Sequence, residues 1–205
     1  MSPAEPIDLK YPFVGNWLVL NSPANRVPSH GTSAFGSSYA IDFVPVNSVG
    51  RSAPFTLRSL TLPEPPENFP GFGRTILSPV IGIVVARLDT VPDHFAYRGL
   101  PSLGYVLGQK KRSSAGWAAL AGNHVGIDIG TAVIFLCHLK QGSIRVPVGA
   151  RVRPGDPIAR CGNTGNSTEP HLHLQAISSL VVERAQAVPI TFQGALPSNG
   201  EIVLA

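Results

Sequence analysis

A turn that leads directly into an alternating segment is the feature that most limits the fold of this chain. Gly162 to Ser167 are rich in Gly, Asn and Ser, and Pro170 is followed by the sequence His-Leu-His-Leu. This order is typical of a loop that enters a β-strand with one polar and one apolar face. Side chains two positions apart on a strand share a face, so His171 and His173 should point together while the leucines pack in a core. Two surface histidines on an edge strand would give the same pattern, and the rest of the sequence must decide between these interpretations.

The composition favours many short strands over long helices. Of the 205 residues, 21 are Gly and 20 are Pro, and charged residues make up only 14%. This mixture suits short strands joined by turns, and the length allows one full-sized domain. We therefore predict an all-β fold, a compact antiparallel barrel or sandwich with long loop insertions.

Apolar runs and turn residues divide the chain into an arm, a main domain and a tail. Residues 1–15 are predicted to form a flexible N-terminal arm with little to bury. Residues 16–192 should form the main domain, with an insertion at about 86–121, and residues 193–205 the C-terminal tail. Strands are expected at residues 17–20, 39–43, 76–85 (two short strands), 124–129, 132–139, 144–148, 152, 158–161, 172–177 and 190–192.

Charge, targeting signals and cysteine content exclude several classes of protein. A formal charge of +4 is common on ordinary domains and no nucleic-acid-binding motif is present, so we expect no nucleic-acid partner. The run from Phe13 to Leu20 is interrupted by Gly15 and Asn16, so we expect no signal peptide, no membrane span and a cytoplasmic location for the chain as written. Cys137 and Cys161 are too few for a disulfide framework; one bridge or two buried thiols both stay open.

Several histidines and one acid could together bind zinc. Asp42 lies in an apolar strand, where a carboxylate is costly unless it is paired or bound. A catalytic zinc ion takes three protein ligands from His, Asp or Glu and leaves a fourth position for water. His30, Asp42 and His173 would meet this requirement, and His138 and His171 would then remain beside the metal to move protons and stabilise an oxyanion. Composition alone does not choose this set over several others.

Four stretches of the chain together form a pattern that is shared with a known protein family. Three of them are Ser78 to Val84, Gly122 to Val125 and His138 to Ile144. The fourth and most specific ends at Gln175 and contains Pro-Gly-Asp, Cys-Gly-Asn-Thr-Gly-Asn-Ser and Pro-His-Leu-His in that order. In these stretches and their order, the chain resembles the lysostaphin-type zinc metalloendopeptidases, which share the duplicated hybrid motif fold. The resemblance extends from near Trp17 to Gln175.

The resemblance implies a zinc metalloendopeptidase with a particular set of site residues. Its metal ligands would be His30, Asp42 and His173, and its two catalytic histidines that do not bind the metal would be His138 and His171. The family's substrates are peptide bonds of bacterial cell-wall peptidoglycan, and its members mostly act outside the cell or in the cell wall. The expected partner is therefore a peptide or peptidoglycan substrate, bound by a monomer without membrane contact.

The sequence departs from the common family pattern at two points. Eleven residues separate His30 from Asp42, where three are more usual, and Gln175 stands where many members have Glu. The Gln could weaken the orientation of a metal ligand. His124 and Asp128 do have the commoner spacing, but they follow the Pro79 to Gly82 hairpin, whereas the family's ligands precede it.

Other functions and roles also stay open. A catalytically degenerate family member that binds or regulates a cell-wall hydrolase is the main alternative. A biotinyl or lipoyl carrier module shares the turn pattern, although Lys140 lies in no matching hairpin. His94 is interpreted as a loop residue, and the insertion is expected to be either a wall of the substrate groove or a solvated surface excursion. Cys137 should face away from His138, into the core.

Overall fold

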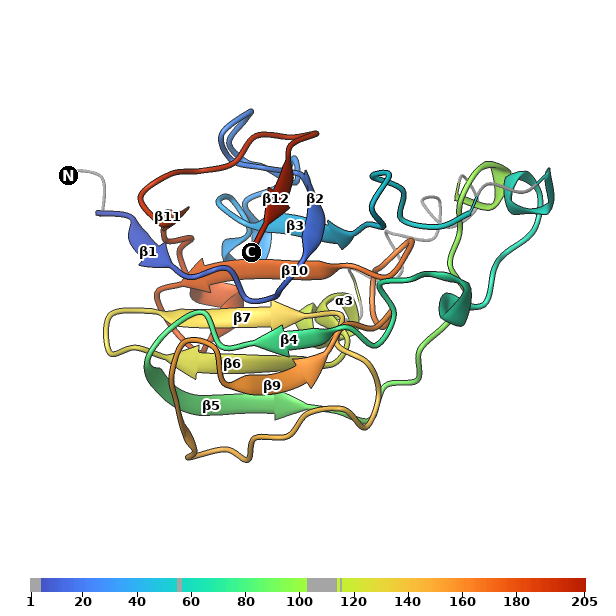
Figure 1. The fold of residues 1–205 in the computed structure, drawn as a ribbon. Coiled ribbons are helices and arrows are strands. Elements are labelled where there is room, and N and C mark those ends of the chain that lie inside the picture. The colour runs from blue at the N-terminus through green and yellow to red at the C-terminus, as the bar shows by residue number, and fades with distance from the viewer. Residues whose placement is uncertain (1–4, 55–56, 103–113, 115) are drawn as a thin grey trace.

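An eight-stranded antiparallel sheet forms the centre of the molecule (Figure 1). The computed structural model describes residues 5–54, 57–102, 114 and 116–205. The strands of the sheet are β2 (Asn16–Leu20), β3 (Ile41–Pro45), β5 (Gly82–Leu88), β6 (His124–Asp128), β7 (Val133–Cys137), β8 (Arg151–Val152), β10 (Leu172–Ile177) and β12 (Ile202–Leu204). Their spatial order is β12-β2-β3-β10-β7-β6-β5-β8.

Two small sheets and a few short helices complete the described structure. The first sheet pairs β1 (Ile7–Leu9) in parallel with β11 (Ile190–Phe192), and the second pairs β4 (Thr75–Leu77) with β9 (Pro157–Arg160). The helices are α3 (Trp117–Ala121) and the 3₁₀ turns η1 (Ala34–Gly36), η2 (Leu57–Leu60), η3 (Pro66–Asn68) and η4 (Val182–Arg184). None of the helices in the described ranges has the length and hydrophobicity to cross a membrane.

The main core lies between the large sheet and the small β4–β9 sheet. Leu172 and Leu174 of β10 pack in one buried cluster with Ile76 of β4 and Ile158 of β9. Because side chains alternate along a strand, His173 must point to the opposite face of the large sheet. The predicted all-β antiparallel fold is confirmed, but its two outer strands, β12 and β8, do not pair with each other within the described residues. The large sheet is therefore open and does not form a barrel.

A second apolar cluster covers part of the histidine face. It contains Phe135 and Cys137 of β7 with Ile177 of β10, and Trp117 of α3 packs against it. The short helix α3 therefore lies on the same side of the sheet as the histidines. The histidine face of the sheet thus also carries buried apolar side chains.

The predicted flexible arm is wrong for its described part, residues 5–15. Leu9 and Phe13 are each only 1% exposed and belong to the main core. The Phe13 ring stacks on Trp17 at 4.3 Å between centroids and meets Phe43 edge-on at 5.0 Å. Aromatic contacts of this kind bury a large apolar area. The N-terminal segment is thus part of the folded domain.

Other predicted elements are also corrected by the structure. The tail contains β12, which pairs with β2, and no strand forms at residues 144–148. Arg87 and Leu88, assigned to the insertion, continue β5. The remaining expected strands are present within a few residues of their predicted ends. The basic run at residues 110–112, also in the insertion, lies outside the described residues.

Candidate active site

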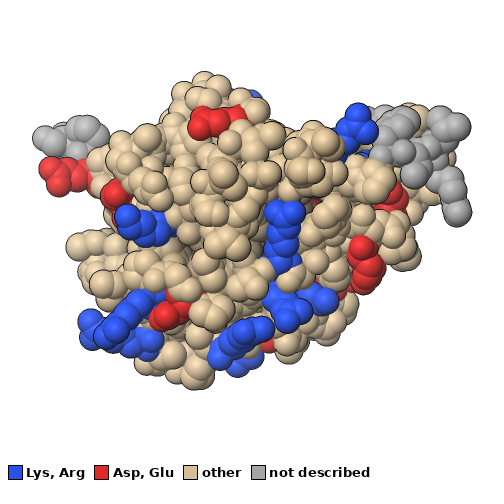
Figure 2. Space-filling view, viewed as in Figure 1, with Lys and Arg blue, Asp and Glu red and all other residues tan. Residues whose placement is uncertain are grey.

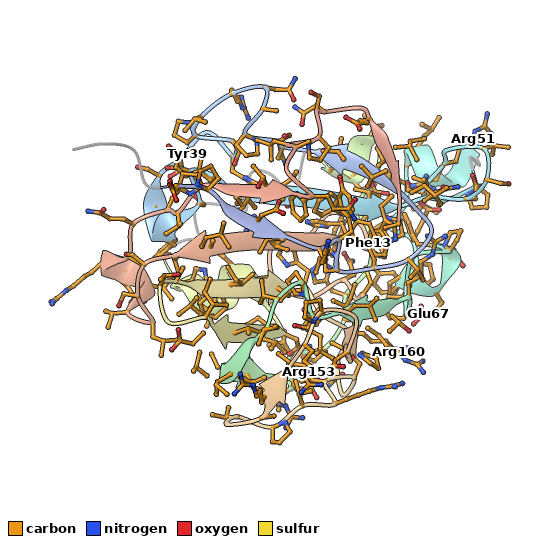
Figure 3. The ribbon with its side chains drawn as sticks, turned by 60° about the vertical axis from the view of Figure 1, so that its left-hand side comes forward. Phe13, Tyr39, Arg51, Glu67, Arg153 and Arg160 are labelled. Atoms are coloured by element: carbon orange, nitrogen blue, oxygen red, sulfur yellow. The ribbon has the colours of Figure 1, made fainter. Side chains whose placement is uncertain are left out.

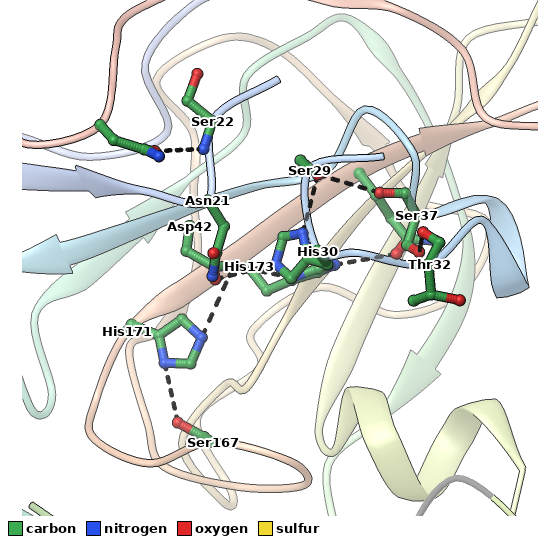
Figure 4. Close-up of polar contacts among 12 residues, drawn as sticks. Asn21, Ser22, Ser29, His30, Thr32, Ser37, Asp42, Ser167, His171 and His173 are labelled. Atoms are coloured by element: carbon green, nitrogen blue, oxygen red, sulfur yellow. Dashed lines mark hydrogen bonds and ion pairs between the residues drawn. The ribbon is translucent and has the colours of Figure 1, made fainter. Parts of the chain in front are cut away.

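A single carboxylate lies at the centre of the histidine cluster (Figure 4). Asp42 of β3 is directly opposite His173 of β10 in the strand register. Its Oδ1 lies 2.9 Å from His173 Nδ1, and its Oδ2 lies 3.0 Å from His30 Nε2. One potential ligand atom from each of the three residues falls within 4.8 Å of the others. Two imidazoles and a carboxylate at this spacing fit the ligand preferences of zinc.

A backbone hydrogen bond brings together the two ends of the long loop between His30 and Asp42. The Ser29 N–H donates to Ser38 O at 3.0 Å, which brings the two ends of the loop together. Within the loop Gly36 has a φ of +69°, and a Cβ on it would lie 2.5 Å from Ile177 Cγ2. Glycine is therefore the residue that fits at this position without displacing Ile177. The loop thus packs on the sheet and places His30 next to Asp42, although eleven residues separate the two in the sequence.

The ring of His30 is oriented by the residue before it. His30 Nδ1 lies 3.0 Å from Ser29 Oγ, and the Ser29 hydroxyl donates to Ser37 O at 3.3 Å. The serine oxygen is therefore left to accept the Nδ1–H. This assignment leaves Nε2 as the nitrogen that faces the carboxylate.

Gln175 orients the ring of His173, as Ser29 orients the ring of His30. His173 Nε2 lies 3.0 Å from Gln175 Oε1, which can only accept, so Nε2 carries a proton. The other end of the amide donates to Phe35 O at 3.0 Å and fixes the direction of the Gln175 side chain. Nδ1 of His173 is thus the atom turned toward Asp42.

Two further histidines lie beside this group without joining it. The rings of His138 and His171 are 4.6 Å apart between centroids, and His138 is 5.8 Å from the ring of His173. The Nδ1–H of His138 donates to Thr164 O at 2.8 Å. The Nδ1–H of His171 donates to Glu169 O at 2.8 Å, and its Nε2 lies 3.8 Å from Asp42 Oδ1. In both rings Nε2 is therefore the unprotonated nitrogen, which can accept a proton.

Burial and the neighbouring charges shift the protonation of the cluster. Burial alone would raise the pKa of Asp42, but His30 and His173 outweigh it and hold this pKa well below its usual value. Burial and the charges of His171 and His173 lower the pKa of His138 well below that of a free imidazole. Asp42 is therefore ionised, and His138 is neutral, at neutral pH.

Asn21 contacts the site although the sequence analysis treated it only as a turn residue. Its Nδ2 donates to Asp42 Oδ2 at 2.7 Å (Figure 4). Asn21 has a φ of 49°, a left-handed conformation that asparagine tolerates better than most residues. The signal in the sequence was an Asn directly after an apolar strand.

His124 and His94 lie outside the cluster. His124 packs between Trp117 and Phe135, with ring centroids 4.6 and 5.7 Å away, and its Nδ1–H donates to Gly122 O at 2.8 Å. Asp128 is four residues further along the same strand, which is about 13 Å, so the two side chains do not share an ion. His94 Nε2 lies 3.1 Å from Gly165 O, in the turn before His171.

Both cysteines are buried free thiols, and the expected direction of Cys137 is wrong. Cys137 is paired with His173 in the sheet and belongs to the cluster on the histidine face. His138 follows it with a φ of 61°, which breaks the strand alternation and turns both residues to the same side. Burial raises the pKa of Cys137 and of Cys161.

The described ends of the insertion pack around the turn that precedes His171. Asp93 Oδ1 accepts the Asn163 N–H at 2.7 Å. At the other end, Ala121 O accepts the His138 N–H at 2.9 Å. The insertion therefore borders the site, and its role as a groove wall stays a prediction.

Comparison with known proteins finds similarity to peptidases. Residues 104–186 match the model of Peptidase family M23. Glycyl-glycine endopeptidase ALE-1 of Staphylococcus capitis is 33% identical over 101 residues, which are 49% of this chain and 27% of that protein. The match thus spans about a quarter of that relative's length.

Two solved structures of similar proteins each cover about three quarters of this chain. The catalytic domain of the antimicrobial peptidase lysostaphin from Staphylococcus simulans has 20% identity and a TM-score of 0.40, with 73% of this chain and 74% of that chain covered. LytU has 24% identity and a TM-score of 0.40, with 73% of this chain and 68% of that chain covered. The segment that matches the family model, residues 104–186, includes His138, His171 and His173. On these matches, residues 104–186 of the chain are similar to Peptidase family M23.

Proposed function

We propose that this protein is a zinc-dependent endopeptidase that hydrolyses peptide bonds of bacterial peptidoglycan. The observation that carries the proposal is the group of His30, Asp42 and His173, whose ligand atoms lie within 4.8 Å of one another, with two more imidazoles at its side. The match of residues 104–186 to Peptidase family M23 supports a peptidase, and the name of the relative, glycyl-glycine endopeptidase ALE-1, supports a peptide bond as the target.

Each residue of the cluster has a distinct role in this proposal. His30 Nε2, an oxygen of Asp42 and His173 Nδ1 would hold Zn²⁺. Zinc, when bound, supplies a Lewis acid for the scissile carbonyl and lowers the pKa of a water molecule to about 7. His138 and His171, each with its Nδ1–H tied to a backbone carbonyl, offer Nε2 to take a proton from the attacking water and to hydrogen-bond to the developing oxyanion.

A degenerate family member that regulates another hydrolase remains the competing function. Loss of one or more site residues would favour it. All five candidate residues are present and converge on one side of the sheet, which supports catalysis instead.

The test combines metal content with cleavage. The purified protein is incubated with oligoglycine and with peptidoglycan, with chelator and then with zinc added back. We expect one bound zinc, cleavage that chelator abolishes and zinc restores, and a fall in kcat of roughly 10²–10⁴ for His138→Gln. His124→Asn removes a histidine outside the cluster and should retain activity. Full activity of His173→Ala would refute the mechanism, and zinc binding without cleavage of either substrate would favour the regulatory alternative.

A further inference from the structure

Two aspartates near the candidate site bind backbone N–H groups of the same loop. Figure 2 shows acidic side chains scattered over the face that it draws, so the partners of each acid can be followed separately. Asp93 Oδ2 accepts the Gln141 N–H at 2.9 Å. Asp89 accepts the N–H groups of Ser143 and Ile144 at 3.2 and 3.3 Å. Both carboxylates thus hold the loop that follows β7.

Asp93 also binds a second loop, the turn that precedes His171. Its Oδ1 accepts the Asn163 N–H at 2.7 Å. The next residue, His94, donates its backbone N–H to Asn163 O at 3.1 Å, and Asn163 Nδ2 donates to His94 O at 2.8 Å. This turn follows β9, whose last residue, Arg160, is labelled in Figure 3. One carboxylate therefore bridges two loops that leave different strands.

The bridge lies where the two loops are in backbone contact. The Gly162 N–H donates to His138 O at 3.0 Å, and the Lys140 N–H donates to Arg160 O at 2.9 Å. A Cβ on Gly162 would lie 2.6 Å from Asp93 Oδ1, closer than side-chain carbons approach other atoms. The carboxylate therefore lies directly against the backbone of the turn, and the glycine leaves room for it.

The bridged turn carries the carbonyl oxygen that orients His138. The Nδ1–H of His138 donates to Thr164 O at 2.8 Å. The Thr164 hydroxyl anchors this residue by donating to Leu139 O at 3.0 Å, and Asp93 anchors the N–H of Asn163 just before it. A glycine flanks this pair of residues on each side, and glycine has a wide choice of backbone conformations. The two anchors therefore keep the carbonyl oxygen in place.

We propose that Asp93 is a positioning residue for His138. It ties Asn163 to the loop after β7 and so keeps Thr164 O at the Nδ1–H of His138. With this hydrogen bond in place the proton stays on Nδ1, and Nε2 is left to accept a proton. The inference rests on the proposed catalytic role of His138. It gives the first described part of the insertion a role that does not depend on contact with substrate.

The test compares Asp93→Asn with the matched control Asp89→Asn in the full chain with zinc added. Each change replaces one carboxylate oxygen with an NH₂ group, which cannot accept a backbone N–H. The control also breaks the ion pair of Asp89 with Arg87 and disturbs the same loop, but Asp89 binds the far end of that loop.

The main readout is the tautomer of His138. Long-range ¹H–¹⁵N NMR spectra of protein labelled with ¹⁵N-histidine distinguish the two ring nitrogens, and the signals of His138 are assigned by their absence in His138→Gln. We expect the parent protein and Asp89→Asn to show the Nδ1–H tautomer. In Asp93→Asn we expect this tautomer to lose its dominance, because Thr164 O is no longer held at the ring.

Peptide cleavage gives the second readout. We expect kcat of Asp93→Asn to fall about 10- to 100-fold with little change in KM, because a misplaced base slows the chemical step without weakening substrate binding. Asp89→Asn should retain the kcat of the parent protein. Tm should fall in both variants, and metal content should equal that of the parent protein, because both aspartates bind backbone N–H groups outside the ligand set.

Two results would overturn the proposal: an unchanged His138 tautomer in Asp93→Asn, and an equal change of tautomer in Asp89→Asn. A lower Tm with an unchanged tautomer would mean that Asp93 only stabilises the fold. The NMR measurement needs no hydrolysis. If the parent protein cleaves no peptide, the proposed peptidase activity fails, and the tautomer still decides whether Asp93 positions His138.

Discussion

The hydrogen bond on one nitrogen of a histidine decides which nitrogen is offered to a metal. Ser29 holds Nδ1 of His30, and Gln175 holds Nε2 of His173, so the two rings present different atoms to Asp42. Partners of this kind fix the tautomer and the ring direction of a ligand. The Gln that departs from the common family residue at this position therefore still provides an acceptor.

Removing the Gln175 amide should weaken metal binding. In Gln175→Ala, His173 Nε2 loses its acceptor and Phe35 O loses its donor. We expect zinc affinity to fall about 10–100-fold, measured by competition with a chromophoric chelator.

Gln175→Glu is the matched control for this effect. A carboxylate still accepts the proton of His173 Nε2 but has no N–H for Phe35 O. Zinc affinity should stay within about tenfold of the parent protein while Tm falls. If Gln175→Ala binds zinc as tightly as the parent protein, Gln175 does not orient the ligand.

The alternation of His and Leu in the sequence predicted that His171 and His173 share one face of a strand. The free-energy cost of burying a carboxylate indicated that Asp42 must be paired or bound to a metal. Asn21 and Thr164 escaped prediction for a physical reason. The contact of Asn21 depends on a left-handed backbone at the end of β2, and Thr164 acts through its carbonyl oxygen. A backbone carbonyl has no signature in the sequence.

Among the elements, strands with a clear apolar face were predictable and the short or interrupted ones were not. Ile144, Val146 and Val148 alternate like a strand, but Pro147 has no N–H to donate to a ladder. β12 was missed because three residues give too little pattern to recognise. Its pairing with β2 depends on a partner about 185 residues away in the chain.

The N-terminal segment should contribute strongly to stability although its sequence resembles a loose arm. Phe13 is 1% exposed and packs against Trp17 and Phe43, whereas its neighbour Val14 is 63% exposed. We expect Phe13→Ala to lower the unfolding free energy by about 3–5 kcal/mol in urea denaturation. Val14→Ala should change it by no more than about 0.5 kcal/mol. Equal, small effects would mean that this segment does not belong to the cooperative core.

At the scale of the whole molecule, the large sheet separates two surfaces with different properties. One side carries the histidine cluster and α3, and the other carries β4, β9 and the main apolar core. The sequence predicted the histidines of the first surface.

The global stability of the molecule should depend on pH through His124. Burial between Trp117 and Phe135 lowers the pKa of this side chain below its usual 6.5. As the pH falls through 6.5, His124 binds a proton in the unfolded chain but stays neutral in the folded protein. The free energy of unfolding therefore decreases. In His124→Asn the amide can still donate to Gly122 O but cannot titrate.

The measurement compares the slope of unfolding free energy against pH, from 7.5 to 5, for the parent protein and His124→Asn. We expect the parent slope to be steeper by up to about 1.4 kcal/mol per pH unit. The asparagine variant should be less stable at every pH because ring contacts are lost, so only the difference in slope bears on the prediction. The histidines of the cluster are present in both proteins, and their contributions cancel in this difference. Parallel curves would show that His124 takes up a proton as readily in the folded protein as in the unfolded chain.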